Sequence, residues 1–589
     1  MKSILIIFFL ISTSSLTYAQ TTSEAQIRGT IINFTEKTIQ IGDTTLSVSE
    51  KGEFSFKIKT DFPTFYIVKY KYSNWTIYVE PGKTTELKIT IGDNSSVNFM
   101  GDLKSSNDYL QKIVSLKNST YEFYDQNWVR MHSLVESGYI SIMDSLRSLF
   151  VKPLIALSKN DKSISSLFIK LIKTDVDCEF NSIILKYPER HFIFTREKTS
   201  LSQSVLKNLN LATIDNIQYS KLPNYKMFCK ELINYKADIL INASTVSKHY
   251  NLEKMEAVFQ LLPTMFKNQA LLDFWLAEYL YQHIEDNGLA NSMKYIEEFN
   301  LRCKTTIYKT RINDLYTSIV DGEKDHFVKT YKTANGFMLQ SHIFYPENMV
   351  KGEKRPAIVI FHGGGWNGGN PSWAFGKAKH YRDLGMIAIA AQYRLSNRKD
   401  ITAVEAMSDA RNLMKWIRLN SDSLGIYPDR IVACGWSAGA HLAVSTAIFN
   451  DSLNMPHINS IPNAMILESP AVSLMTPNKG KEWEYAVFGP NVSVSSANPI
   501  EHIRTGLPPT IILQGRDDIC TPLEGAQSFH DKLIAKGNYC ELWVYDGVGH
   551  IYTPTYLANQ DLIIPDQKIQ EQADEKAAEF LRKFGYIHK

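Results

Sequence analysis

The chain has 589 residues, 44% of them hydrophobic and 21% charged, a composition that supports several packed cores and excludes global disorder. Its 64 basic residues nearly balance its 61 acidic ones, giving a net charge of +3. Because no basic run accompanies this balance, a nucleic-acid partner is not expected. The six cysteines are too few for a disulfide scaffold and lack metal-ligand spacing, so no metal site is expected either.

The first 19 residues are predicted to be a secretory signal peptide. Lys2 precedes the apolar stretch Ile4–Ile11, and small residues just before Gln20 suit a cleavage site. The apolar stretch is too short to cross about 30 Å of hydrocarbon. We therefore expect a mature chain that is secreted or periplasmic, without stable membrane insertion.

Residues 20–100 are expected to form a small β-sandwich, because short alternating segments are separated by turn residues. The segments Thr45–Ser49 and Phe54–Ile58 flank Glu50–Glu53, which predicts a hairpin turn between them. The aromatic residues of this region suit sugar stacking or an ordinary strand core, and the core is the simpler interpretation. They are Tyr66, Tyr70, Trp75 and Tyr78.

Residues 101–322 carry apolar residues at spacings of three and four, which predicts a mostly helical region, and we find no catalytic motif in it.

Residues 323–589 alternate apolar strands with helices, the pattern of a mostly parallel sheet covered on both faces. Helices are expected at Thr402–Leu419 and Pro522–Ala535. The expected strands are Phe327–Thr333, Phe337–Tyr345, Ala357–Phe361, Met386–Ala391, Arg430–Cys434, Ala464–Leu467, Thr510–Leu513 and Leu542–Tyr545. A region of this size should fold alone, and its site should lie at the carboxyl ends of its strands.

The sequence GWSAG at 435–439 follows one of these strands and precedes an expected helix from Ala440. Strand, tight turn and helix are the context of a nucleophile elbow, in which flanking glycines make room for the sharp turn. Ser437 is therefore predicted to be a catalytic nucleophile.

A glycine run, HGGGW at 362–366, follows the preceding central strand. Glycines leave backbone N–H groups open to a cavity. The N–H groups of Gly363 and Gly364, with that of Ala438, are predicted to hold the oxyanion formed when Ser437 attacks an ester carbonyl. His362 is expected to shape this loop through a hydrogen bond.

The base is expected after the last strand, where His550 stands in the sequence YDGVGH. The acid should precede it in the chain, and Asp517 and Asp518 compete for that role because both follow one strand. We choose Asp518. Glu468 is a lesser candidate for the acid, and His441 is expected to pack in the core.

The phrases FHGGGW, AQYRL, GIYPDRIVACGWSAGAHLA, LPPTIILQGRDD and YDGVGH resemble the hormone-sensitive-lipase-like esterases of the α/β-hydrolase fold. More narrowly they resemble bacterial acetylxylan-esterase-like carbohydrate esterases. The resemblance implies an α/β-hydrolase domain with Ser437 as nucleophile, His550 as general acid and base, Asp518 orienting the imidazole, and no cofactor. Ala440 and Gln514 depart from the family pattern, outside these three residues.

The substrate implied by the resemblance and by secretion is a small ester, such as the acetyl group of a glycan like xylan. Trp366 and Trp436 flank the oxyanion loop and the nucleophile and are predicted to border the substrate, unless both point into the core. The segment Ser469–Pro499 is expected to be a lid or a pocket wall, with Trp483 among its aromatic residues.

Other functions remain open at this point. They are a general short-chain esterase or lipase, a prolyl-oligopeptidase-like peptidase, and an envelope binding or scaffold protein with an inactive hydrolase domain.

Overall fold

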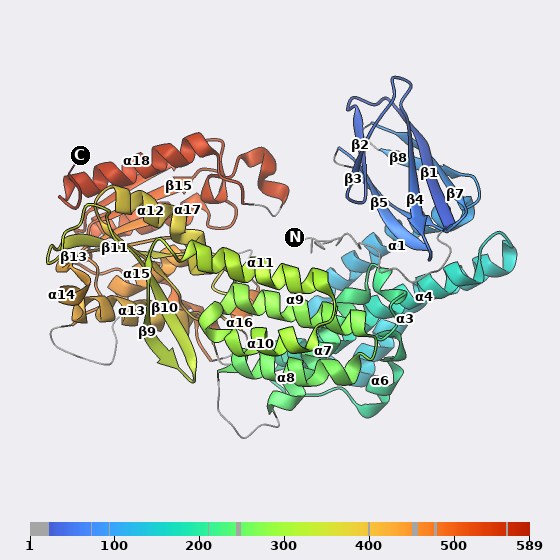
Figure 1. The fold of residues 1–589 in the computed structure, drawn as a ribbon, viewed down its shortest axis with the longest axis horizontal. Coiled ribbons are helices and arrows are strands. Elements are labelled where there is room, and N and C mark those ends of the chain that lie inside the picture. The colour runs from blue at the N-terminus through green and yellow to red at the C-terminus, as the bar shows by residue number, and fades with distance from the viewer. Residues whose placement is uncertain are drawn as a thin grey trace. The chain divides into compact units, whose positions relative to one another are not determined.

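The computed structural model of the chain describes residues 23–71, 73–92, 95–209, 211–242, 249–397, 401–449, 458–475, 480–489, 491–560 and 563–588. The predicted signal peptide, residues 1–19, lies outside them. The chain divides into two compact units (Figure 1). The first holds the described residues up to 239 with Leu261–Leu272, and the second holds Leu240–Gln260 with Asp273–Lys589.

The first unit begins with the expected β-sandwich, made of two four-stranded sheets. The strand order is β4-β1-β7-β8 in one sheet and β3-β2-β5-β6 in the other. Alternating apolar side chains of both sheets form one core. The strands are β1 Ser23–Ile32, β2 Thr38–Ile41, β3 Thr44–Ser47, β4 Glu53–Thr60, β5 Thr64–Tyr70, β6 Ser73–Val79, β7 Thr84–Thr90 and β8 Ser96–Met100.

The predicted hairpin at Glu50–Glu53 is wrong. β3 pairs with β2, whereas β4 pairs with β1 in the other sheet. The turn therefore carries the chain from one sheet to the next, because turn residues fix a change of direction but not which strands pair. The aromatic side chains behave as core residues, since Tyr70, Trp75 and Tyr78 are buried.

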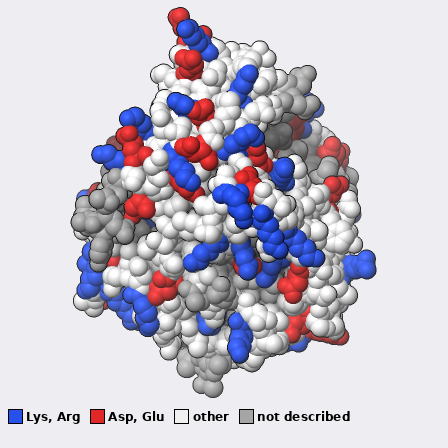
Figure 2. Space-filling view, turned by 90° about the vertical axis from the view of Figure 1, so that its right-hand side faces the viewer, with Lys and Arg blue, Asp and Glu red and all other residues white. Residues whose placement is uncertain are grey.

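Figure 2 shows basic and acidic side chains intermixed over the face that it draws, as expected from the balanced charge of the sequence.

Helices follow the sandwich, as predicted. The helices are α1 Lys104–Gln126, α2 Trp128–His132, α3 Glu136–Asn160, α4 Ser166–Leu185, α5 Tyr187–Thr195, α6 Gln203–Asn208, α7 Tyr225–Asn242, α8 Tyr250–Met265, α9 Gln269–Asn287, α10 Met293–Arg302 and α11 Thr306–Gly322. Among the described helices, none is both long and apolar enough to cross a bilayer.

The second unit contains one eight-stranded sheet in the order β16-β15-β14-β13-β11-β12-β10-β9. β9 and β10 form the predicted hairpin, β10 pairs antiparallel with β12, and all other neighbours are parallel. The strands are β9 Phe327–Ala334, β10 Phe337–Phe344, β11 Arg355–Phe361, β12 Ile387–Ala391, β13 Ile426–Trp436, β14 Ala464–Glu468, β15 Thr510–Gly515 and β16 Cys540–Tyr545.

Helices cover both faces of this sheet, because its central strands are apolar on both sides. Helices α13, α15 and α17 contribute to the core on one face, and α12 and α18 to the core on the other. The helices are α12 Phe375–Asp383, α13 Ala403–Leu419, α14 Ser421–Leu424, α15 Ala438–Ile448, α16 Lys481–Phe488, α17 Leu523–Ala535 and α18 Gln567–Lys583. The fold is the predicted mostly parallel α/β sheet.

Part of the helical region packs on this sheet. The side chain of Asn291 exchanges two hydrogen bonds with the backbone of Met338 in β10, at 2.8 and 2.9 Å. His249 stacks on Phe337, with ring centroids 4.4 Å apart. The second unit therefore includes helical residues that precede the predicted boundary at 322, and that boundary stays a prediction.

Candidate active site

The nucleophile elbow lies where β13 ends and α15 begins. Ser437 has φ 55° and ψ −122°, a conformation that L-residues rarely adopt. Glycine is required two residues before and two residues after Ser437. A Cβ on Gly439 would lie 2.0 Å from the carbonyl oxygen of Phe361, and one on Gly435 would lie 2.5 Å from the backbone of Gly439. The N–H of Ser437 donates to the carbonyl of Glu468, which fixes the turn on β14.

His550 approaches the nucleophile from the loop after β16. Its Nε2 lies 3.0 Å from Ser437 Oγ, within hydrogen-bonding distance. Ile551 and Tyr552, which follow it, have φ of 49° and 58°. These left-handed residues turn the chain sharply, so the imidazole is presented on a tight, strained loop.

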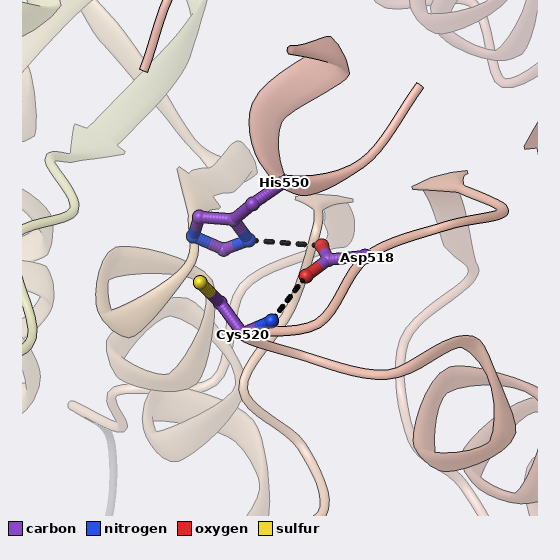
Figure 3. Close-up of side chains that lie close together, drawn as sticks. All are labelled: Asp518, Cys520 and His550. Carbon is purple, nitrogen blue, oxygen red and sulfur yellow. Dashed lines mark hydrogen bonds and ion pairs between the residues drawn. The ribbon is translucent and has the colours of Figure 1, made fainter. Parts of the chain in front are cut away.

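Asp518 lies on the loop after β15 and contacts His550 on the side of the ring opposite Ser437. Its Oδ2 lies 2.8 Å from His550 Nδ1, and its Oδ1 accepts the N–H groups of Cys520 and Thr521, both at 2.8 Å. Figure 3 shows the carboxylate between the imidazole and the backbone of Cys520. Burial alone would raise the pKa of Asp518, but the hydrogen bond and charge of His550 and the donors of Thr521 lower it below the ordinary carboxyl value.

The competing carboxylate, Asp517, does not reach the imidazole. It is exposed and accepts a hydrogen bond from the Thr555 hydroxyl at 2.8 Å. The structure thus brings Ser437, His550 and Asp518 together and leaves Asp517 outside.

The predicted oxyanion donors surround the same elbow. A Cβ on Gly363 would lie 2.7 Å from the indole of Trp436 and 3.2 Å from its carbonyl oxygen, so the glycine loop touches the strand that carries Ser437. Gly364 has φ 110°, which favours glycine. Ala438 is the first residue of α15, where a backbone N–H has no partner within the helix.

His362 shapes this loop and does not face the nucleophile. It is 1% exposed, stacks on Tyr393 with ring centroids 4.3 Å apart, and its carbonyl accepts the Tyr393 hydroxyl at 2.8 Å. Burial lowers the pKa of His362 to about 4. A neutral imidazole fixed in this way supports the backbone of the glycine run.

The two tryptophans predicted to border the substrate have different surroundings. Trp366 is 3% exposed and donates its indole N–H to His441 Nδ1 at 3.2 Å. Its ring centroid lies 6.2 Å from those of Trp483 and Phe488, both in α16, within the segment that was expected to be a lid or pocket wall. Trp436 is half-buried and packs beside the core of the other sheet face. A direct contact of either indole with substrate stays a prediction.

Glu468, the lesser candidate acid, lies apart from His550. It is buried and pairs with Lys377, whose Nζ lies 2.6 Å from its carboxylate and 2.9 Å from that of Asp574. Burial raises the pKa of Glu468, whereas the two carboxylates keep the pKa of Lys377 well above its ordinary value. This ion cluster stabilises the end of β14, on which Ser437 is anchored.

Two residues that organise the site, Ser469 and Thr521, could not be recognised from the sequence. Ser469, with φ 40°, accepts the N–H of Ile551 on its Oγ at 3.1 Å and the hydroxyl of Thr521 on its carbonyl at 2.9 Å. The Thr521 hydroxyl also lies 2.9 Å from Asp518 Oδ2. Ser469 therefore joins the histidine loop to the acid loop. No motif marks it, because its role depends on two segments distant in sequence.

Comparisons with known proteins relate the region that holds this site to esterases. Residues 342–533, about a third of the chain, match the BD-FAE family model. The chain is 26% identical over 194 residues to a probable carboxylic ester hydrolase, LipM, of Mycobacterium tuberculosis, covering 30% of this chain and 44% of that protein. It is also 26% identical over 216 residues to the esterase LipQ of the same organism, covering 33% and 50%.

Among solved structures, esterase 2 of Thermogutta terrifontis is 30% identical, covering 45% of this chain and 97% of that chain with a TM-score of 0.41. The chain spans half or less of the length of the curated esterases named above. The carboxyl-terminal part of the chain is an α/β-hydrolase domain related in sequence to esterases.

Proposed function

We propose that the chain is a secreted serine hydrolase that cleaves carboxylic esters through an acyl-enzyme. The observation that carries this proposal is the continuous contact from Ser437 Oγ to His550 Nε2 at 3.0 Å and from His550 Nδ1 to Asp518 at 2.8 Å. The relatedness of this region to esterases supports it, and the signal-like residues 1–19 support secretion.

In this mechanism His550 Nε2 accepts the Ser437 proton as Oγ attacks the ester carbonyl carbon. The N–H groups of Gly363, Gly364 and Ala438 stabilise the oxyanion. The imidazolium, held by Asp518, then gives its proton to the alcohol oxygen as the carbon–oxygen bond breaks. Water attacks the acyl-enzyme by the same route, releasing the acid and restoring Ser437.

The substrate class that we propose is the acetyl ester of a glycan such as xylan. The resemblance to carbohydrate esterases and the proposed secretion support this choice. The close packing of Trp366 against Trp483 and Phe488 supports a restricted acyl space. In an open acyl pocket each added buried methylene would favour binding by about 0.8 kcal/mol. The preference for short or long acyl chains therefore discriminates a restricted acyl pocket from an open one.

The test is hydrolysis of nitrophenyl esters by the purified full chain, followed by acetate release from acetylated xylan, with Ser437→Ala as control. We expect acetyl esters to be cleaved at least about tenfold faster than octanoyl esters. A rate that rises with chain length would favour a lipase. Cleavage of prolyl peptides without ester cleavage would favour a peptidase, and no hydrolysis at all would favour an inactive scaffold.

A further inference from the structure

Cys520 differs from the other five cysteines of the chain because it is exposed, whereas they are all buried. It stands two residues after Asp518, on the loop that carries the acid of the proposed triad. Figure 3 shows its sulfur directed toward the imidazole of His550, beside the Asp518 carboxylate.

These three side chains offer a thiol, an imidazole nitrogen and a carboxylate oxygen that all lie within 4.8 Å of one another. Such ligands bind Zn²⁺ at about 2.3, 2.0 and 2.0 Å in tetrahedral sites, which places neighbouring ligand atoms about 3.5 Å apart. Small rotations of the side chains of exposed Cys520 and half-buried His550 would bring the ligand atoms from within 4.8 Å to about 3.5 Å of one another. A thiolate and a carboxylate would also balance the double positive charge of the ion.

We propose that Asp518, Cys520 and His550 form a site for Zn²⁺ or a similar thiophilic divalent cation, and that the bound ion inhibits the hydrolase. The binding site follows from the three side chains themselves, and only the inhibition rests on the proposed function. Hard cations such as Mg²⁺ are excluded by chemistry, because they prefer six oxygen ligands.

Binding would take the imidazole out of catalysis through Nδ1, the ring nitrogen that faces Asp518. The ion replaces the direct contact between Nδ1 and Asp518, and the ring proton moves to Nε2, where it faces Ser437 Oγ and prevents proton acceptance. The Cys520 thiol loses its proton to solvent as the sulfur–metal bond forms.

The test compares the reduced full chain with Cys520→Ser, which keeps the backbone N–H that Asp518 accepts. Asp517→Asn, which removes an exposed carboxylate next to the site, is the matched control. Equilibrium dialysis against ZnCl₂ and MgCl₂ counts the bound ion without any activity measurement. Ester hydrolysis is followed in parallel with added Zn²⁺ and then with a chelator.

We expect one Zn²⁺ and no Mg²⁺ per chain for the wild type and for Asp517→Asn, with hydrolysis inhibited and then restored by the chelator. Cys520→Ser should weaken zinc binding and raise the half-inhibitory concentration by about tenfold or more. Equal zinc binding by wild type and Cys520→Ser, or no stoichiometric zinc, would overturn the proposal. Zinc binding without ester hydrolysis in any variant would instead overturn the proposed function and leave the site standing.

Discussion

At the scale of single residues, Ser437, His550 and Asp518 form a chain of contacts. We therefore expect that replacing any one of them removes most of the hydrolytic activity. Ser437→Ala or His550→Ala should each lower kcat/KM for a chromogenic acetate about 10³-fold or more, because triad members act together. Circular dichroism and thermal unfolding should show a folded protein in both cases. Residual activity close to wild type in either variant would remove that residue from the mechanism.

The same experiment discriminates the two neighbouring carboxylates. Asp518→Asn should cost about 10⁴-fold in kcat, because an amide favours the wrong imidazole tautomer. Asp517→Asn serves as the matched control, since the Thr555 hydroxyl is the only hydrogen-bond partner of the Asp517 carboxylate among the described residues. A larger loss in Asp517→Asn than in Asp518→Asn would mean that the acid has been misassigned.

The positions of Ser437, His550 and the glycine run at the site could be predicted from sequence, because each stands in a motif next to a strand end. Asp518 could be chosen over Asp517 only by its position, and the structure supplies the geometric reason. Ser469 and Thr521 could not be predicted, because a hydrogen bond between two loops leaves no local pattern. The burial of Trp366 could not be predicted either, since the sequence does not indicate to which side an indole turns.

Ser469→Ala is expected to disorganise the histidine loop. It leaves the half-buried N–H of Ile551 without its acceptor, a loss of about 1 kcal/mol. Because Ser469 holds the residue that follows His550, we expect kcat to fall about tenfold or more with KM little changed.

The control is Ser496→Ala, which removes an exposed hydroxyl bonded only to a nearby backbone carbonyl. Steady-state kinetics over a pH series check the prediction, because a displaced base also changes the pH profile of kcat/KM. An unchanged kcat with a lowered Tm would make Ser469 a purely structural residue.

At the scale of elements, continuous apolar strands and their helices were predictable, because buried parallel strands give a strong pattern. The strands β2 and β8, four and five residues long, carry few alternations and could not be recognised from the sequence. The turn at Glu50–Glu53 was assigned to the wrong connection, because strand pairing depends on the rest of the sheet.

The oxyanion loop should make stability depend on pH. His362 is neutral in the fold, with a pKa of about 4 against an ordinary value of about 6.5. Between these values the unfolded chain binds a proton that the folded chain does not, so the free energy of unfolding falls as the pH decreases from about 6.5 to 4. From pH 6.5 to 5 the loss is about 2 kcal/mol.

Thermal unfolding of the full chain at pH 7 and pH 5 measures this effect, and His362→Gln, which cannot be protonated, should show a smaller fall in Tm. Other buried histidines of the second unit, such as His342, keep part of the dependence in the variant, since burial lowers the pKa of His342 to about 3. The same fall in both proteins would show that His362 does not titrate in this range.

At the scale of the whole molecule, the second unit begins before the end of the helical region at residue 322. Asn291 and His249 contact β10 from segments that precede residue 322. A fragment Asp325–Lys589 keeps all triad residues but exposes these contacts, and it should unfold at a lower temperature than Leu240–Lys589. Soluble expression, Tm and acetate-ester hydrolysis of both fragments check this. Equal Tm values would show that the flanking helices contribute nothing to the sheet.

The backbone of the site has a further consequence. Ser437, Ser469, Ile551 and Tyr552 all have positive φ, each costing about 1–3 kcal/mol that the rest of the fold must offset. Relief of this strain should therefore stabilise the fold, and at Ser437 it would remove the proposed nucleophile. Ser437→Gly should raise Tm above that of Ser437→Ala, because glycine adopts this conformation without strain whereas alanine does not. Thermal scans of the two variants decide it, and an equal Tm would mean that the elbow is relaxed. Under the proposed function, a gain in stability at Ser437 removes the nucleophile, which sets stability against turnover at this position.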